Sequence, residues 1–172
     1  MPFSILKRSL FITLLALLSW STAGYAEEPK KDIVFVDLEG NETKLSDYKG
    51  KWVIVNLWAT WCPPCLVEIP DLVMFHEEHK DKDAIVIGVN YEAIEKEKVK
   101  TFAQSQMINF PVVRFEGKVD GKSSPFGPLY GLPTTYMVAP DGSVVAARTG
   151  MIDQKMLETF MAKYAEMTAA KE

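Results

Sequence analysis

The sequence predicts an α/β domain in which helices flank a mixed central β-sheet. Two strongly apolar strands, each followed by a helical pattern, come first, and a pair of strands and a last helix follow them. The order βαβα and then ββα is typical of one layered α/β domain. A length of 172 residues suits one such domain together with a short additional segment.

The first half of the predicted domain contains a hairpin, two buried strands and two helices. Residues 33–38 alternate weakly and end at a Glu39-Gly40-Asn41 turn, so that residues 42–45 should pair back on them. The apolar runs 51–58 and 84–90 predict strands buried on both faces. Helical patterns follow both runs: one helix begins at Pro63-Pro64 and is kinked by Pro70, and an amphipathic helix covers 92–107.

The second half of the predicted domain begins with a short strand at 110–115 and a surface loop at 117–128, which is rich in Gly, Ser and Pro. Strands at 132–139 and 143–148 should be joined by the tight turn Pro140-Asp141-Gly142. Asp153 is placed to cap a last helix that runs through Glu166. The spacing predicts one apolar face on this helix, made by Met156, Leu157, Phe160, Met161 and Tyr164.

Residues 1–26 differ in composition from the rest and have the layout of a secretory signal. Lys7 and Arg8 precede the apolar run Leu10–Leu18, and small residues stand three and one before a cut after Ala26. An uncleaved anchor is the alternative, because the uncharged stretch approaches the roughly 20 residues of a spanning helix. With either outcome, residues 27–172 form the domain and face an oxidising compartment such as the bacterial periplasm. We expect a periplasmic protein that is free rather than membrane-anchored.

Composition excludes several classes of protein. Two cysteines are too few for a disulfide-stapled scaffold, and 19 basic against 23 acidic residues leave no positive surplus for nucleic acid. An apolar fraction of 48% is too high for a disordered chain. The two cysteines, Cys62 and Cys65, are therefore the main chemical signal.

Two cysteines separated by two residues at a strand-to-helix junction suit reversible disulfide chemistry. The helix N-terminus favours the thiolate of Cys62 over its thiol. Cys65 follows one helical turn later, where it can attack a mixed disulfide between Cys62 and a partner. A purely structural disulfide is the alternative, although so short a loop would constrain the unfolded chain little.

A zinc site made by Cys62, Cys65, His76 and His79 is a second alternative. Its spacing is unfavourable, because one continuous helix would hold Cys65 and His76 about 16 Å apart along its axis. We therefore expect no metal, and interpret His76 and His79 as solvated helix residues beside two glutamates.

Several separated motifs resemble the thioredoxin superfamily. They are Asn56-Leu-Trp-Ala-Thr-Trp-Cys-Pro-Pro-Cys65, Glu68, Pro70 and Gly131-Leu-Pro-Thr-Thr135. More narrowly, they are similar to its exported, TlpA/ResA-like branch of thiol-disulfide oxidoreductases (redoxins), which includes the cytochrome-maturation reductases. The similarity extends from about Asp32 to about Tyr164 and implies a thioredoxin-like three-layer domain.

The resemblance implies a role for each matching position. Cys62 would be the attacking thiol and Cys65 the resolving one, with Trp61 packed beside the reactive sulfur. Pro133 matches the cis-proline loop that faces the disulfide, with an ordinary trans bond as the alternative. The backbone of Leu132 would pair with an extended segment of the client.

Two positions depart from cytosolic thioredoxins. Asn56 stands where they carry a buried acid that moves protons to and from the second cysteine, and Asn does not titrate. Glu68, three residues after Cys65, resembles an acidic residue of the exported branch and is our candidate for proton traffic and partner recognition. The alternative for Glu68 is a solvated helix carboxylate.

The leading hypothesis is a periplasmic oxidoreductase that reduces or exchanges disulfides in exported clients, with apocytochromes c as one candidate class. By family analogy a membrane thiol carrier would supply its electrons. We expect a monomer that needs no cofactor beyond the Cys62–Cys65 disulfide. The alternatives are a disulfide-donating oxidant, a non-catalytic binding module, and copper handling by its methionines. Hydroperoxide reduction is disfavoured, because Val55 and Ala59 stand where a Pro and a Thr would precede Cys62.

Overall fold

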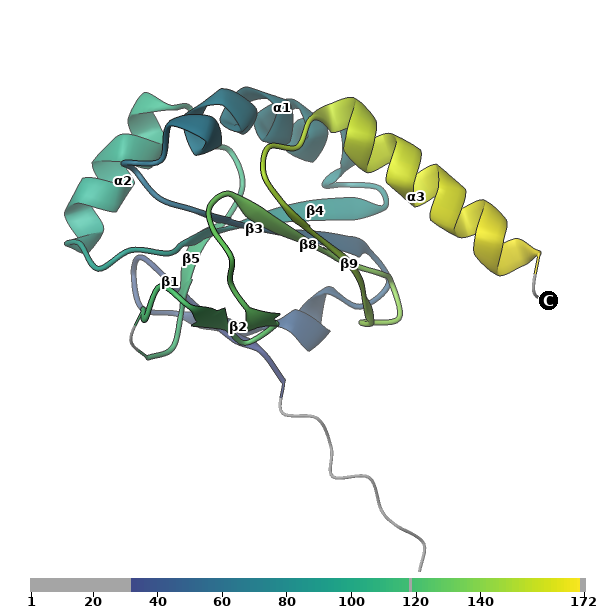
Figure 1. The fold of residues 1–172 in the computed structure, drawn as a ribbon, viewed down its shortest axis with the longest axis horizontal. Coiled ribbons are helices and arrows are strands. Elements are labelled where there is room, and N and C mark those ends of the chain that lie inside the picture. Colours follow the sequence, from purple (N-terminus) through teal and green to yellow (C-terminus); the bar gives the residue numbers. More distant parts are fainter. Residues whose placement is uncertain (1–31, 118, 171–172) are drawn as a thin grey trace, which may run out of the picture. The chain divides into compact units, whose positions relative to one another are not determined.

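A seven-stranded sheet of order β2-β1-β5-β4-β3-β8-β9 forms the centre of the computed structural model, which describes residues 32–117 and 119–170 (Figure 1). From Asp32 onward the chain forms one compact unit. The predicted signal or anchor at 1–26 lies outside the described residues.

Buried strands make up the centre of the sheet. β3 (Trp52–Trp58) pairs in parallel with β4 (Ala84–Asn90), and β4 pairs in parallel with β5 (Val112–Phe115). On its other side β3 pairs antiparallel with β8 (Thr134–Val138). Every residue of β3 and β8 is buried, as expected for strands covered on both faces. The mixed α/β sheet predicted from the sequence is confirmed.

Antiparallel hairpins form both edges of the sheet. β1 (Val34–Asp37) and β2 (Glu42–Lys44) pair as predicted, and the turn between them contains Gly40 at a φ of 99°. Glycine suits this left-handed backbone because it has no Cβ. At the opposite edge β9 (Val144–Thr149) pairs with β8.

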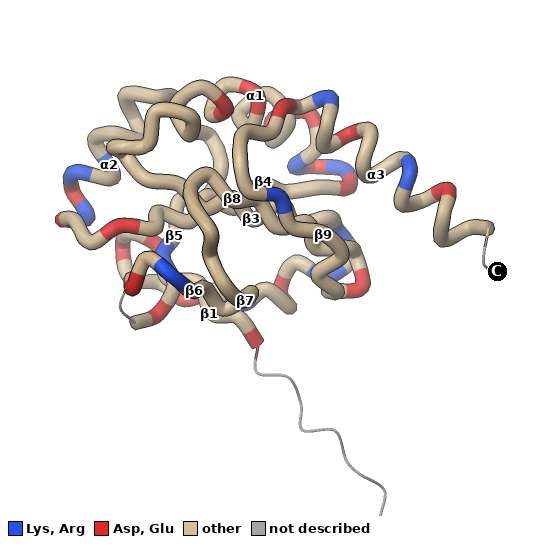
Figure 2. The backbone as a smooth tube through the Cα atoms, viewed as in Figure 1, with Lys and Arg blue, Asp and Glu red and all other residues tan. Residues whose placement is uncertain are grey.

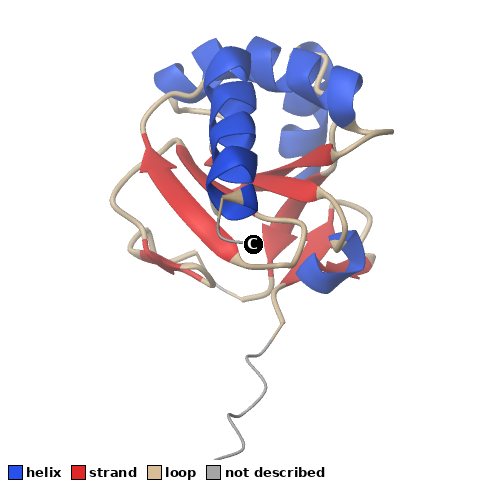
Figure 3. Cartoon of the chain, turned by 90° about the vertical axis from the view of Figure 1, so that its right-hand side faces the viewer, coloured by secondary structure: helices blue, strands red, loops and turns tan. Residues whose placement is uncertain are grey.

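The α-helices cover one face of the sheet (Figures 1 and 3). α1 (Pro63–His79) and α3 (Gln154–Ala169) pack on that face, and Leu72 and Leu157 join Ile54 of β3 in one core cluster. α2 (Lys96–Ser105) contributes Phe102, whose ring stacks on Trp58 at 5.5 Å. Helix α1 runs on through Pro70.

The opposite face of the sheet is covered by the 3-10 helix η1 (Leu45–Tyr48) and by the chain around Phe126. Phe126 stacks on Tyr136 of β8 with ring centroids 4.5 Å apart. Helices, sheet and this second cover make three layers. The segment predicted as a plain loop also contains two short paired strands, β6 (Ser123–Ser124) and β7 (Gly127–Pro128).

Several predicted boundaries were wrong. α2 begins at Lys96 rather than at residue 92, because the Glu92 side chain bonds to Thr60 in another loop. β5 begins after Pro111, which has no N–H to donate to a ladder. α3 starts at the predicted cap, where the Asp153 carboxylate accepts from Met156 N at 2.7 Å, but it extends to Ala169. Met156 was placed on the apolar face and is exposed.

Acidic and basic residues are interspersed along α3 and over the rest of the described chain (Figure 2). Within residues 32–117 and 119–170, the helices are too short or too polar to cross a bilayer.

Candidate active site

The two cysteines lie where β3 passes into α1 and are joined as a disulfide. Cys62 is the N-cap of α1, its Sγ is 2.08 Å from that of Cys65, and the two Cα atoms are 5.3 Å apart. Pro63 and Pro64 occupy the first turn, where the missing N–H groups cost no helical hydrogen bond. Cys62 is 2% exposed and Cys65 is fully buried, so a partner must reach the pair through Cys62.

Glu68 lies one turn of α1 after Cys65 and is buried, with 2% of its surface exposed. The alternative interpretation as a solvated carboxylate is wrong. Its Oε1 accepts a hydrogen bond from Asn56 Nδ2 at 2.7 Å, and its Oε2 accepts from the backbone N–H of Ile152 at 2.9 Å. Each carboxylate oxygen therefore has a fixed donor, one from the central strand and one from the segment that leads into the last helix.

Burial raises the pKa of Glu68 from 4.5 to about 7. Desolvation is the largest cause, because it penalises the charged form, and the hydrogen bonds from Asn56 and Ile152 only partly offset it. A group with a pKa near neutrality can both accept and release a proton at working pH. The carboxyl stands three positions from Cys65 on the same helix, which is the spacing that brings two side chains to one helix face.

Asn56 lies fully inside the sheet on β3 and links Glu68 to β8. Its Nδ2 donates to Glu68 at 2.7 Å and to Thr135 Oγ1 at 3.0 Å. All three side chains are buried. The side chain at this position therefore orients the acid without titrating itself.

The loop before β8 carries a cis peptide bond between Leu132 and Pro133, which confirms that prediction. A cavity of about 320 Å³ lies next to it. Trp61, Leu132 and Glu92 are among the residues that line this cavity. Trp61 is 67% exposed, so the residue before Cys62 offers an aromatic surface to solvent.

The zinc alternative is not supported by the positions of the four residues. Both cysteines are in the disulfide, and His76 is buried, with its Nδ1 accepting from Val86 N at 3.2 Å. His76 was wrongly interpreted as solvated: it faces the sheet, where β4 supplies a backbone donor. His79 is partly buried and lies near Asp83, Glu78 and Glu158 on the far end of α1.

Sequence reasoning missed the other members of the site. Thr135 and Ile152 meet Glu68 and Asn56 only through the folded chain. Glu92 was assigned to a helix, yet its carboxylate accepts from Thr60 N at 2.8 Å, two residues before Cys62. The one local signal for Glu92 was its position directly after a buried strand that runs parallel to β3.

Comparisons with known proteins agree with this geometry. The sequence pattern of the AhpC/TSA family matches residues 27–147, which include both cysteines and the cis-proline loop. The chain is 34% identical over 130 residues to the thiol-disulfide oxidoreductase ResA of Bacillus subtilis, covering 76% of this chain and 70% of that one. It is 35% identical over 133 residues to a ResA of Bacillus cereus, with 77% and 74% covered.

A solved structure gives the same result for the fold. The chain aligns with the crystal structure of a DsbF homologue from Corynebacterium diphtheriae with a TM-score of 0.67 and 26% identity, covering 78% of this chain and 85% of that one. The resemblance drawn from the motifs is thereby confirmed. The chain belongs to the AhpC/TSA family, and it is a thiol-disulfide oxidoreductase of thioredoxin-like fold.

Proposed function

We propose that the protein reduces disulfides in exported client proteins through a cycle in which Cys62 attacks, Cys65 resolves and Glu68 handles the proton. The observation that carries this proposal is the buried Glu68 carboxyl, held by two donors one turn from Cys65, with a pKa of about 7. A neutral-pH acid–base group beside the buried cysteine is what the second half of an exchange cycle requires.

The first step forms a mixed disulfide. The Cys62 thiolate attacks one sulfur of the client disulfide, a bond forms between Cys62 Sγ and that sulfur, and the other client sulfur leaves as a thiolate. Cys62 is the more accessible member of the pair and caps the helix N-terminus, which stabilises its thiolate.

The second step releases the client. The Cys65 thiol gives its proton to the Glu68 carboxylate, and the resulting thiolate attacks Cys62 Sγ. The client's second sulfur leaves as a thiolate. The two client thiolates take up the proton that Cys62 released when it ionised and the proton that Glu68 holds, so the client has gained two electrons and two protons in all. The protein is left with the Cys62–Cys65 disulfide, the state seen in the structure.

The client would lie against the cis-proline loop. The backbone of Leu132 pairs with an extended client segment, and Pro133 faces the disulfide, as in the superfamily that the motifs resemble. Exposed Trp61 and the 320 Å³ cavity beside Leu132 provide room for a side chain of the client. The apolar lining of much of this cavity favours an apolar or aromatic group there.

We place this activity in the periplasm, because residues 1–26 have the composition of a secretory signal. Apocytochromes c before haem attachment are the proposed clients, and a membrane thiol carrier is the proposed electron donor. Both follow from the resemblance to the exported branch that includes the cytochrome-maturation reductases. The protein would act as a monomer whose redox group is the cysteine pair alone.

Trapping of the mixed disulfide on Cys62 tests which proteins are clients. In a Cys65→Ser variant the mixed disulfide on Cys62 cannot be resolved, so mass spectrometry of adducts formed in cells should identify exported proteins with cysteine pairs. A Cys62→Ser variant is the matched control and should form no such adduct. Absence of adducts on Cys65→Ser would overturn exchange with exported clients.

The reduction potential of the cysteine pair tests whether the protein reduces its clients or donates disulfides to them. Equilibration with reduced and oxidised glutathione should give a value closer to that of thioredoxin, about −270 mV, than to that of the disulfide donor DsbA, about −120 mV. A value at the oxidising end would instead support the disulfide-donating alternative.

A further inference from the structure

Glu92 is a second buried carboxylate near the cysteine pair, and the exchange cycle described above does not use it. It lies just after β4 and is 6% exposed. Its Oε1 accepts from Thr60 N and from Asn90 Nδ2, both at 2.8 Å, and its Oε2 accepts from Thr60 Oγ1 at 3.2 Å. All three donors are neutral groups, which stabilise a negative charge without cancelling it.

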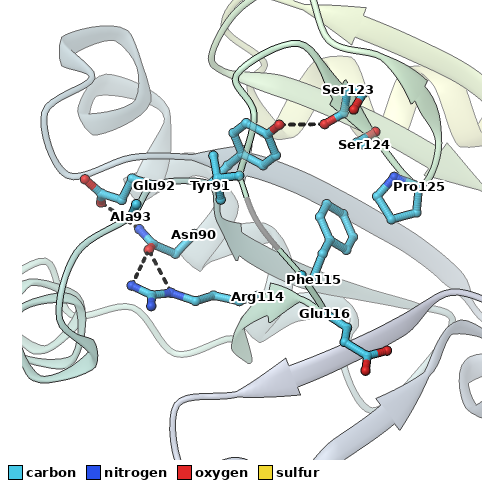
Figure 4. Close-up of a pocket in the computed structure, with 12 residues that line it drawn as sticks. Asn90, Tyr91, Glu92, Ala93, Arg114, Phe115, Glu116, Ser123, Ser124 and Pro125 are labelled. Carbon is cyan, nitrogen blue, oxygen red and sulfur yellow. Dashed lines mark hydrogen bonds between the residues drawn. The ribbon is translucent and has the colours of Figure 1, made fainter.

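Arg114 is connected to this network through the side-chain amide of Asn90 (Figure 4). Arg114 donates from Nε and Nη2 to Asn90 Oδ1 at 3.3 and 3.1 Å, and from Nη2 to the carbonyl of Ile94 at 2.7 Å. The Asn90 amide is thus oriented between the guanidinium and the Glu92 carboxylate. Asn90, Glu92 and Arg114 are among the residues that line a cavity of about 640 Å³.

The other end of the network is the turn that leads into the active site. Thr60 stands two residues before Cys62, whose own N–H donates to Ala59 O at 3.2 Å. Tyr91 N donates to Trp58 O at 2.8 Å, so the chain ends of β3 and β4 stay together beyond the sheet. Glu92 therefore holds the turn 59–61 through a backbone and a side-chain donor of the same residue.

The negative charge of Glu92 and the N-terminus of α1 have opposite effects on the stability of the Cys62 thiolate. The helix dipole favours the Cys62 thiolate, whereas a nearby negative charge favours the protonated thiol. Strong oxidants of this fold owe their potential to a stabilised thiolate, which stabilises their reduced form. A less stable thiolate therefore makes the reduced form less stable and the cysteine pair more reducing.

We propose that Glu92 is a positioning residue for thiol exchange, which fixes the Thr60 turn ahead of Cys62 and, by its charge, makes the Cys62 thiolate less favourable and the cysteine pair more reducing. The inference rests on the proposed exchange through Cys62, and it adds a second acid whose target is Cys62 rather than Cys65.

The Glu92→Gln variant tests the effect of the Glu92 charge on Cys62. It removes the charge but keeps the size of the side chain and an oxygen that can accept from Thr60 N. The ultraviolet absorbance of the thiolate is followed in the reduced protein as pH is raised. We expect the thiolate fraction of Cys62 at pH 7 to rise by about threefold or more. The equilibrium constant with glutathione should move in the oxidising direction by a similar factor.

Two further variants separate charge from structure. Glu116→Gln removes a negative charge from an exposed residue of the same 640 Å³ cavity and should leave the thiolate fraction unchanged. Glu92→Asp keeps the charge and should stay close to the wild type. Amide hydrogen exchange of Thr60 reports the positioning role: Glu92→Ala should lose protection there, whereas Glu92→Gln should retain most of it.

The inference is overturned if Glu92→Gln is less stable to urea yet has the wild-type thiolate titration, since a merely structural role predicts that pair of results. It is also overturned if Glu116→Gln shifts the titration equally. Thiolate titration needs no client, so its outcome is independent of whether trapping succeeds.

Discussion

The Glu68 carboxylate and the backbone N–H of Ile152 are 84 positions apart in the chain and form a hydrogen bond of 2.9 Å inside the protein. This contact joins α1 to the segment that leads into α3. Together with the Asn56 amide, it keeps an acidic side chain in place where solvent cannot reach it.

Replacing Glu68 by Gln should change how stability depends on pH. The pKa of Glu68 is about 7 in the folded protein and near 4.5 in an unfolded chain, so the folded state binds the proton more tightly. Its contribution to the free energy of unfolding is therefore greatest below pH 4.5 and falls by about 3 kcal/mol as pH rises through 7. Urea unfolding of the oxidised protein at several pH values should show this fall in the wild type and not in Glu68→Gln. Equal slopes in the two proteins would contradict a raised pKa.

The same substitution should slow the resolving step of exchange. Without a group to take the Cys65 proton, the mixed disulfide on Cys62 should persist, and its decay at neutral pH should be slower by about tenfold or more. Rapid mixing with a disulfide peptide, followed by acid quench and mass analysis, measures formation and decay separately. Formation should be nearly unchanged, and the inflection near pH 7 in the decay rate should disappear. A slowed first step with a normal second step would place Glu68 elsewhere in the cycle.

Asn56→Leu removes a donor from the Glu68 carboxylate while nearly conserving volume. Because the Asn56 hydrogen bond lowers the pKa of Glu68, its loss should move the inflection of the resolving step above pH 7. Stability should fall by about 1–3 kcal/mol, since a buried polar group loses its partner. Thr135→Val is the matched control: it removes the acceptor at 3.0 Å but leaves the Asn56–Glu68 bond, so the inflection should stay in place.

Gly88→Ala should destabilise the protein although it adds a single methyl group. A Cβ on this residue of β4 would lie 2.6 Å from Phe110 Cε2 and 3.1 Å from Trp58 Nε1. Both rings are buried, so the cost should be about 1–3 kcal/mol by chemical denaturation. Gly131→Ala, whose Cβ would have its nearest contact at 3.8 Å, is the control for stability and should change it much less.

His76 should make the protein less stable in mild acid. Burial lowers the pKa of His76 below its usual 6.5, with the nearby Lys80 charge acting in the same direction and Glu77 and Asp81 opposing it. The unfolded chain then binds the proton more readily, so the stability from neutral His76 is present above pH 6.5 and is lost as pH falls through the lower folded value. In His76→Asn, which does not titrate and keeps an oxygen near the Nδ1 position, that loss should be absent. Measuring the pH dependence of stability in a Glu68→Gln background separates the contribution of His76 from the opposite contribution of Glu68.

Local sequence patterns predicted many of the secondary-structure elements of this protein. The apolar runs of β3 and β4, the hairpin turns and the Asp153 cap are short-range features, and each formed where its residues predicted it. The sequence also predicted the cysteine pair, its place at the strand-to-helix junction and Pro133, because these belong to contiguous motifs that match a known family. The start of α2 was predicted wrongly because Glu92 has a distant partner in Thr60, and the start of β5 because Pro111 has no N–H to donate to a ladder.

Tertiary structure alone decided the electrostatics of the site. Glu68 is a buried acid with a pKa of about 7 because the packed chain removes it from water, and the hydrogen bonds from Asn56 and Ile152, on other elements, only partly offset this desolvation. The burial of His76 against β4 was hidden for the same reason. Desolvation and hydrogen bonding act through space, so sequence spacing predicts which residues can do the chemistry, and only the packed chain sets the proton affinity with which they do it.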